Sequence, residues 1–203
     1  KTYEDTYKKA PKIIFLQNHG IFVAADSANE IKVMYDSIGS RIREGKNLSL
    51  PDRTISEWRS EKVGILQDLF TKRNLRVKAI HSPLIAHFAS GLDIYQKISR
   101  PFTPDIIVYC KSNYLFLEKD IDRTGIEEKI AAFESAHGYP PRVILEEQGG
   151  LIAVEENKQS LQTVIEVFLD MMKISYLSEQ YGGPHFMSDE QISFIYKWEE
   201  EDY

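Results

Sequence analysis

The chain has few cysteines and no long apolar run. Cys110 is the single cysteine among 203 residues, so an internal disulfide is excluded and a reducing compartment is expected. A membrane-spanning helix needs roughly 20 consecutive apolar residues, and the apolar runs here have only the length of strands. The polar, charged start at Lys1-Thr2-Tyr3-Glu4 does not resemble a secretory signal. We therefore expect a cytoplasmic protein that does not act at a membrane.

Positively charged residues are also fewer than negatively charged ones. Lys and Arg number 25 against 31 Asp and Glu, which gives a formal net charge of −6. Basic runs, the usual mark of a nucleic-acid surface, do not occur, and neither does a nucleotide-binding glycine loop. Nucleic acid is therefore not expected as a partner. The hydrophobic fraction of 42% is enough for one large or two small cores.

One segment near the start carries the most information. Two apolar, β-branched-rich runs, near residues 12–17 and 20–25, flank the polar sequence Asn18-His19-Gly20. This pattern predicts a strand, a tight turn and a second strand, because Asn and Gly tolerate positive φ. His19 would then stand at the end of a strand, where a metal or a substrate could reach it. A purely structural role for this histidine remains open from the residues alone.

The same pattern occurs a second time, in residues 141–155. Pro11 corresponds to Pro141 and Gly20 to Gly150, with no gap. The apolar positions of the following helices correspond as well: Ile31, Met34, Tyr35, Ile38 and Ile42 fall on Leu161, Val164, Ile165, Phe168 and Met172. This spacing predicts the same buried stripe on both helices and indicates an internal duplication, with chance similarity as the alternative. The second turn reads Gln148-Gly149-Gly150, so the duplicate offers no imidazole.

The remaining patterns predict alternating helices and strands. We expect Asp26 or Ser27, with Glu30, to cap a helix that runs to about residue 44, and residues 45–54 to form a linker. A helix is expected from Ser56 to about residue 74, and a final helix from Ser188. Further helices are expected at 2–9, 84–89, 124–137 and 157–181. Further strands are expected at 75–80, 142–146 and 151–154. Residues 106–110 and 114–117 are expected to pair as a hairpin. This mixture predicts an α/β fold of three α/β/α layers around a mainly antiparallel sheet.

The series of apolar strand, Asn18-His19-Gly20, apolar strand, acidic residue and helix resembles the metal-histidine segment of the class II aldolase/adducin family. The resemblance implies that His19 is one of three histidines that hold a divalent metal, usually zinc. It also implies that Val77 to Pro83 stands where the family has His-x-His-Pro. His81 would be the surviving histidine there, and an ordinary strand-end histidine is the other interpretation.

Residues 100–111 and 182–187 are similar to the aldolase part of the rhamnulose-phosphate-aldolase-like proteins. The resemblance implies cleavage of a ketose phosphate, such as rhamnulose phosphate, to dihydroxyacetone phosphate and an aldehyde, in a homo-oligomer. It covers only the later part of the family's aldolase region, without the acid/base glutamate or the phosphate-binding loops. We therefore expect a piece of a longer protein and nominate no catalytic residue. The alternative is a non-catalytic, adducin-like domain for association.

The expected organisation has three parts. Residues 1–50 form the carboxy-terminal part of a first aldolase-like copy, 51–74 a linker and helix, and 75–203 a degenerate second copy. Several other residues could carry chemistry but have simpler interpretations. These are His87 packed in a helix, His137 at a helix end, His185 in a loop that could shape an interface or pocket, solvated Glu146-Glu147 and Glu155-Glu156, and Cys110 as a packed thiol in a strand.

Overall fold

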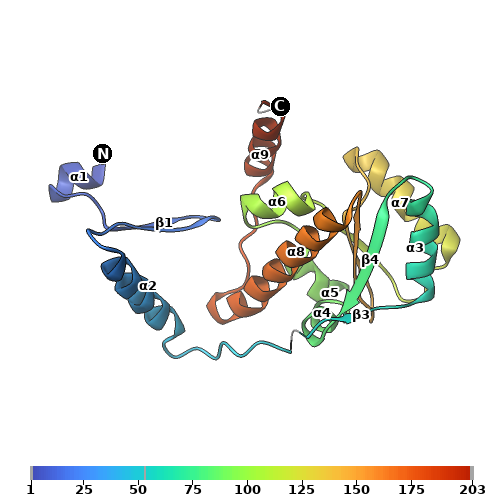
Figure 1. The fold of residues 1–203 in the computed structure, drawn as a ribbon, viewed down its shortest axis with the longest axis horizontal. Helices are drawn as coiled ribbons and strands as arrows, with labels where there is room; N and C mark the ends of the chain where they lie inside the picture. The colour runs from blue at the N-terminus through green and yellow to red at the C-terminus, as the bar shows by residue number, and fades with distance from the viewer. Residues whose placement is uncertain (1, 53, 202–203) are drawn as a thin grey trace. The chain divides into compact units, whose positions relative to one another are not determined.

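The computed structural model describes residues 2–52 and 54–201, and the side chains of residues 2–52 and 54–197 (Figure 1). The chain divides into two compact units, Lys1–Ser49 and Leu50–Tyr203. Each unit is described by itself. No helix in the described part of the chain is both long and apolar enough to cross a membrane.

The described residues of the smaller unit form one hairpin and two helices. Helix α1 (Thr2–Tyr7) precedes strands β1 (Ile13–Leu16) and β2 (Gly20–Val23), which pair antiparallel, and helix α2 (Ala28–Arg43) follows. Asn18 has a φ of 56°, as a tight turn requires. Ser27 caps α2 by accepting from the Glu30 N–H at 3.3 Å, while the Glu30 carboxylate accepts from the N–H of Asp26. The predicted strands and capped helix are confirmed.

The larger unit is built on a five-stranded sheet in the order β3-β4-β7-β6-β5. Only the β5–β6 pair is parallel, so the prediction of a mainly antiparallel sheet is confirmed. The strands are β3 (Ser56–Glu57), β4 (Arg76–His81), β5 (Leu115–Leu117), β6 (Val143–Glu146) and β7 (Leu151–Glu155). The helices are α3 (Glu61–Thr71), α4 (Pro83–Phe88), α5 (Leu92–Tyr95), α6 (Pro104–Cys110), α7 (Arg123–His137), α8 (Lys158–Ser178) and α9 (Asp189–Glu201), with 3₁₀ turns η1 (Gln96–Ile98) and η2 (Glu179–Tyr181).

Helices cover both faces of this sheet, which gives the predicted α/β/α layers (Figure 1). Along β6, Val143 and Leu145 join a core with α4, α6 and α8, whereas Ile144 joins a second core with α3 and α7. Successive residues of a strand point to opposite faces, so an uninterrupted apolar strand supplies both cores. The hairpin β6–β7 is therefore the centre of the larger unit.

Two sequence predictions about element type or bounds were wrong. Residues 106–110 lie in helix α6, not in a strand, and β5 pairs with β6 rather than with them. Thr103 stands at the N-cap position and Pro104 at the first helical turn, and these start signals outweigh the β-branched run. Residues 56–57 form strand β3, and the next helix begins only after Ser60, whose side chain caps it.

The two hairpins have the same local geometry at a constant separation of 130 positions (150 − 20). Ile13 pairs with Val23 as Val143 pairs with Ala153. The backbone bond from Ala24 N to Lys12 O, 2.9 Å, has its counterpart from Val154 N to Arg142 O, also 2.9 Å. Both turns place a side chain at φ 56°, Asn18 in one and Gln148 in the other, and both following helices are capped at the matching position, by Ser27 and by Asn157.

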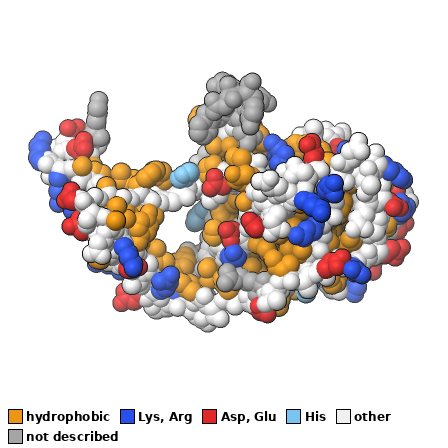
Figure 2. Space-filling view, viewed as in Figure 1, with side chains coloured by type: hydrophobic (Ala, Val, Ile, Leu, Met, Phe, Trp, Pro, Cys, Tyr) orange, Lys and Arg blue, Asp and Glu red, His pale blue; other side chains and the backbone are white. Residues whose placement is uncertain are grey.

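The matching positions differ in burial. Phe15 is 67% exposed and its counterpart Leu145 is 1% exposed; Phe22 is 59% exposed and its counterpart Ile152 is fully buried. The predicted apolar stripe is buried on α8, whereas on α2 the described residues are half-buried or exposed. Figure 2 shows hydrophobic side chains gathered on the smaller unit. The same hairpin-and-helix pattern is thus buried within the larger unit and exposed within the smaller one.

Candidate functional site

The first turn, residues 17–20, presents His19. The backbone N–H of His19 donates to the carbonyl oxygen of Leu16 at 3.3 Å, which closes the turn, and the side chain is exposed. The surroundings are open: a Cβ placed on Gly20 would meet nothing within 4 Å among the described residues. The structure therefore places an accessible imidazole at the tip of a short β-hairpin.

The second turn, residues 147–150, has the same backbone but crowded surroundings. A Cβ on Gly149, the counterpart of His19, would lie 2.7 Å from Cγ of Glu146. A Cβ on Gly150 would lie 2.6 Å from the Ile80 carbonyl oxygen and 2.6 Å from Cγ of Trp58. Real Cβ atoms do not approach other atoms so closely. Glycine at both positions is thus a steric requirement of the packing around this turn.

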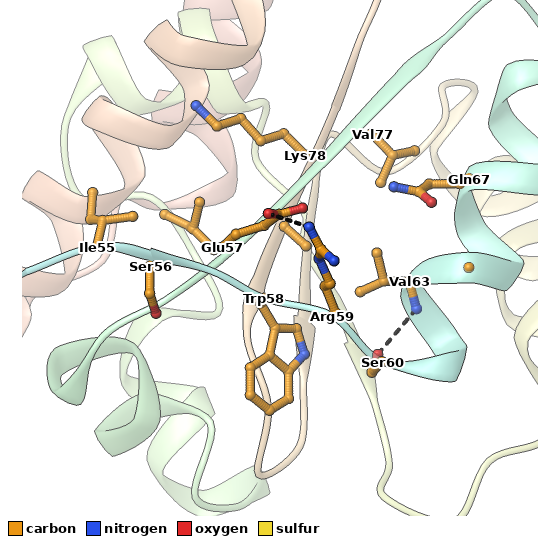
Figure 3. Close-up of a pocket in the computed structure, with 13 residues that line it drawn as sticks. Ile55, Ser56, Glu57, Trp58, Arg59, Ser60, Val63, Gln67, Val77 and Lys78 are labelled. Atoms are coloured by element: carbon orange, nitrogen blue, oxygen red, sulfur yellow. Dashed lines mark hydrogen bonds and ion pairs between the residues drawn. The ribbon is translucent and has the colours of Figure 1, made fainter.

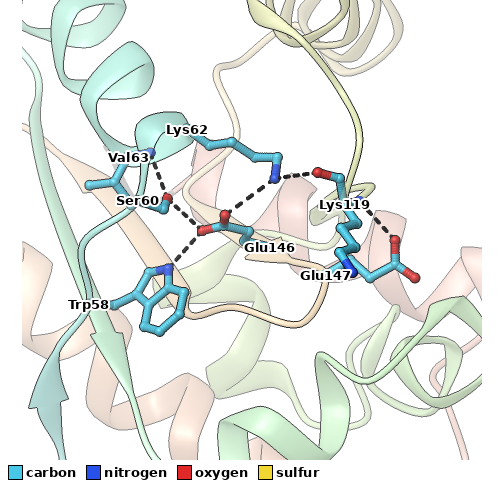
Figure 4. A network of polar contacts seen from close by, with 7 residues as sticks. All are labelled: Trp58, Ser60, Lys62, Val63, Lys119, Glu146 and Glu147. Atoms are coloured by element: carbon cyan, nitrogen blue, oxygen red, sulfur yellow. Dashed lines mark hydrogen bonds and ion pairs between the residues drawn. The ribbon is translucent and has the colours of Figure 1, made fainter.

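Glu146, the last residue of β6, holds the second turn in a polar network (Figure 4). Its Oε2 accepts from Trp58 Nε1 at 2.7 Å and from Ser60 Oγ at 2.8 Å, and its Oε1 lies 3.4 Å from Lys62 Nζ. The Ser60 oxygen in turn accepts from the Val63 N–H at the start of α3. The carboxylate therefore joins β6, the segment after β3, and α3.

The expectation of solvated carboxylates around this turn was wrong for two residues. Glu146 is 5% exposed and Glu155 is 9% exposed. Each has a cationic partner, Lys62 for Glu146 and Arg142 for Glu155, whose Nε lies 3.0 Å from the carboxylate. A buried carboxylate is tolerated because charged and neutral donors satisfy its oxygens. Glu147, which is half-buried, accepts from the Lys119 N–H at 2.8 Å, and Glu156 is exposed.

His81 lies next to the second turn but is used in packing. Its ring stacks on the indole of Trp58, with centroids 5.1 Å apart and planes inclined by 27°. Trp58 thus contacts both the His81 ring and the turn at Gly150. This role could not be predicted, because Trp58 falls within the helix expected from Ser56, and the helix begins only after Ser60.

The other titratable residues singled out from the sequence are dispersed. His87 lies between the rings of Phe88 and Tyr176, and burial, with the nearby Lys97, lowers its pKa. His137 contacts Phe133 and Tyr139 at the end of α7, and His185 is exposed in the loop before α9. Cys110 is buried on helix α6, where its thiol lies 3.6 Å from the Val164 carbonyl oxygen and burial raises its pKa. It is a packed thiol, as expected, but on a helix.

A cleft of about 640 Å³ runs along the outer edge of β4, between β3 and α3 (Figure 3). Its lining includes Trp58, Gln67 and Lys78, and the ion pair of Glu57 with Arg59 at 2.9 Å. The hydrogen bond and charge of Arg59 lower the pKa of the Glu57 carboxyl. Among the described residues that line the cleft, none is a histidine or a cysteine. The lining thus offers neither an imidazole nor a thiol for metal or nucleophilic chemistry.

The described residues do not by themselves form a metal centre. Catalytic zinc is typically held by three protein ligands. In residues 2–52 and 54–201, no group of three or more His, Cys, Asp or Glu side chains is placed to hold an ion. His19 is one potential ligand, and the second turn has no histidine.

Replacing Gly149 with histidine tests whether the second turn can hold a metal. We expect Gly149→His to bind no additional zinc and to lower the free energy of unfolding by about 1–3 kcal/mol, because the new Cβ would collide with Glu146. Metal analysis and urea unfolding measure the two effects. A new zinc bound in stoichiometric amount would contradict this interpretation of the second turn.

Comparison with known proteins gives similarity to solved structures only. No family model and no curated protein matches the chain. The chain is similar to L-fuculose 1-phosphate aldolase, with 15% identity and a TM-score of 0.46 over 61% of this chain and 55% of that one. It is also similar to YgbL from Escherichia coli, for which an aldolase, epimerase or decarboxylase activity has been suggested, with 17% identity and a TM-score of 0.45 over 66% and 64% of the two chains. The chain therefore spans less than two thirds of the length of either structure.

Proposed function

We propose that this chain is part of a metal-dependent aldolase of the class II type that cleaves a ketose phosphate. The smaller unit contributes His19 as one ligand of a divalent metal, zinc by resemblance, and the remaining ligands come from outside the described residues. The larger unit is a non-catalytic copy that keeps the fold. The natural partners are a sugar phosphate, of which rhamnulose phosphate is the candidate, and further copies of the same subunit.

The contrast between the two turns is the observation that supports this proposal. The backbone geometry is the same at both, yet the imidazole occurs only at the turn whose surroundings are open. At the other turn, glycine replaces histidine, and Trp58 and Glu146 fill the space. A histidine with a purely structural role would be expected to pack against neighbours, as His81 and His87 do. His19 is instead exposed at the tip of a hairpin.

The His19→Ala substitution tests the proposal in the complete gene product. We expect loss of the bound metal and a fall of at least about hundredfold in the rate of ketose-phosphate cleavage, since catalytic metal sites depend on each protein ligand. The fold should be unchanged, because the His19 side chain is exposed. His185→Ala is a suitable control, because His185 is also exposed but lies in the larger unit. Unchanged cleavage and metal content in His19→Ala would refute the assignment.

A non-catalytic, adducin-like role in association is the second candidate, and a different observation favours it. The smaller unit exposes a set of large apolar side chains, which are Ile13, Ile14, Phe15, Leu16, Phe22, Val33, Tyr35 and Ile42. Exposed apolar side chains in this number are typical of an interface. The two candidates differ in metal content: a complete gene product that associates normally but binds no divalent metal would favour the second.

A further inference from the structure

The outer edge of strand β4 is an open sheet edge within the larger unit. Strand β3 lies opposite only two of its six residues, Ile80 and His81. Val77 lies opposite Val154 of β7, but the N–H of Val154 donates to Arg142 on the far side, so these two valines do not bond each other. The N–H and carbonyl groups of Val77 therefore point outward, where the described residues of the larger unit place no strand.

The opposite edge of the sheet is closed by side chains. On β5, the carbonyl oxygen of Leu117 faces β6, so that of Phe116 faces outward, where it accepts from Lys129 Nζ at 3.3 Å. The preceding outward carbonyl, that of Tyr114, accepts from the Tyr95 hydroxyl at 2.8 Å. Side chains that occupy an edge in this way hinder pairing with another strand. Of the two edges, the described residues leave that of β4 able to accept a strand.

Two clefts run along this open edge. The first, of about 640 Å³ (Figure 3), and a second of about 660 Å³ share Gln67 of α3 and Val77 of β4 in their linings. Together they form a groove between α3 and β4. The groove begins near Glu57, whose carboxylate is paired with Arg59, and ends near Glu156. It therefore follows the direction that an added strand would take.

Gly64 of α3 lines this groove at an exposed position. A Cβ placed on it would meet nothing within 4 Å among the described residues, and its φ is not positive. Neither packing within this chain nor backbone conformation therefore requires glycine here. Glycine inside a helix is unfavourable compared with alanine. A glycine in this place allows the backbone of a partner to come close to the helix.

The charges along the edge favour an acidic partner. Arg76 and Lys78 lie two positions apart, on one face of β4. Glu155, opposite Arg76 on β7, pairs instead with Arg142 at 3.0 Å, and Lys78 donates to the neutral side chain of Gln162. Among the described residues, neither cation of β4 has a carboxylate partner. Because opposite charges on facing positions of paired strands attract, a strand with carboxylates two positions apart complements this edge.

A second copy of this chain does not complement it. In a two-fold pairing of two β4 edges, Val77 would face Val77, and Lys78 of each copy would face Arg76 of the other. Shifting the register by two residues would bring Arg76 to Arg76 or Lys78 to Lys78 instead. Like charges on directly opposing positions destabilise a strand pair. The occupant must therefore carry the opposite charge.

We propose that the outer edge of β4 binds an extended acidic segment of a partner protein, which adds to the sheet as a strand beside Val77. The carboxylates of the segment face Arg76 and Lys78, and its alternate side chains point toward α3, as those of Val77 and Ala79 do. In this kind of recognition the main-chain hydrogen bonds provide affinity and the alternate side chains provide specificity. The inference uses the larger unit alone and is independent of whether His19 binds a metal.

Titration of the 203-residue chain with an octapeptide of alternating glutamate and valine, followed by the NMR signal of the Val77 amide, tests this inference. An octapeptide of alternating lysine and valine is the control for charge. We expect the glutamate peptide to shift the Val77 signal and to bind at least about tenfold more tightly than the lysine peptide. The physical reason is that the facing charges change from attraction to repulsion.

Methylation of the peptide nitrogens separates strand pairing from charge. In the proposed pairing, a valine of the peptide exchanges both backbone hydrogen bonds with Val77, whereas the glutamate amides point away from β4. We expect methylation of the valine nitrogens to weaken binding at least about tenfold, and methylation of the glutamate nitrogens to leave it unchanged.

The Gly64→Leu substitution tests the groove from the side of the protein. The leucine side chain would extend into the groove, so we expect it to weaken binding of the glutamate peptide at least about tenfold. Urea unfolding should show that the variant is at least as stable as the wild type, because leucine favours a helix and meets no close neighbour. A loss of binding in this variant is then not a loss of fold.

Three results would overturn the inference. Failure of the glutamate peptide to bind would mean that Arg76 and Lys78 only keep other strands away from the edge. Equal binding of the peptide methylated at its valines would mean attraction between charges without strand pairing. Protection of the Val77 amide that rises with protein concentration in the absence of peptide would mean that a second copy occupies the edge.

Discussion

Replacing Gly150 with alanine should destabilise the larger unit by about 3 kcal/mol, at the upper end of what overpacking costs. The new methyl group would lie 2.6 Å from the Ile80 carbonyl oxygen and 2.6 Å from the Trp58 ring. The carbonyl belongs to the backbone of a central strand and cannot move without disturbing the pairing of β4. Gly150 does not have a left-handed backbone conformation, so the expected loss is steric in origin. Urea unfolding monitored by circular dichroism measures it.

Gly20→Ala is the matched control for this substitution. Gly20 occupies the corresponding position of the first turn, also without positive φ, and a Cβ there would meet nothing within 4 Å among the described residues. We expect Gly20→Ala to change the free energy of unfolding by less than about 0.5 kcal/mol, as for an ordinary surface substitution. Equal effects of the two alanines would show that the difference in packing around the two turns is not real.

Trp58→Ala should have the second large effect, a loss of about 3–5 kcal/mol, which is typical of truncating a packed aromatic side chain. The indole packs on Gly150, stacks on His81 and donates to Glu146, so its removal widens the cleft over the turn and leaves a buried carboxylate with one donor fewer. The same unfolding experiment measures the loss. A loss below about 1 kcal/mol would contradict the role assigned to this residue.

Trp58→Phe separates the packing from the hydrogen bond. Phenylalanine keeps an aromatic ring over the turn but cannot donate to Glu146, which retains Ser60 and Lys62 as partners. We expect a loss of about 1–3 kcal/mol, the usual cost of leaving a buried acceptor short of a donor. If Trp58→Phe were as damaging as Trp58→Ala, the hydrogen bond rather than the ring would be the important contact.

The sequence was sufficient to predict the hairpins β1–β2 and β6–β7, the capped helices and the mainly antiparallel sheet. These depend on local signals, such as the Asn18 turn, the Ser27 cap and Gly138, which ends α7 with φ 78°. Helix α6 was missed because Ile106, Ile107 and Val108 favour a strand by composition. Thr103 at the N-cap position and Pro104 in the first turn start a helix there instead. Where an apolar run is too short to show a helix or strand period, the residues that start a helix are the better guide to its structure.

The surroundings of the candidate site could not be predicted. Trp58, Ser60 and Lys62 lie more than 80 positions from Glu146 in the sequence, and only the strand order brings them together. Burial could not be predicted either, because Phe15 and Leu145 belong to matching apolar patterns and yet differ in exposure. Leu145 lies in a five-stranded sheet, whereas the described residues around Phe15 form a two-stranded one. Local pattern specifies a supersecondary unit, whereas its environment depends on the tertiary contacts available to it.

The number of divalent metal ions bound per chain in the complete gene product tests the central claim most directly. The claim is that one of two matching turns supports metal chemistry and the other cannot. We predict one ion in the wild type, none in His19→Ala and one in Gly149→His. Retention of the ion in His19→Ala, or a second ion in Gly149→His, would contradict it.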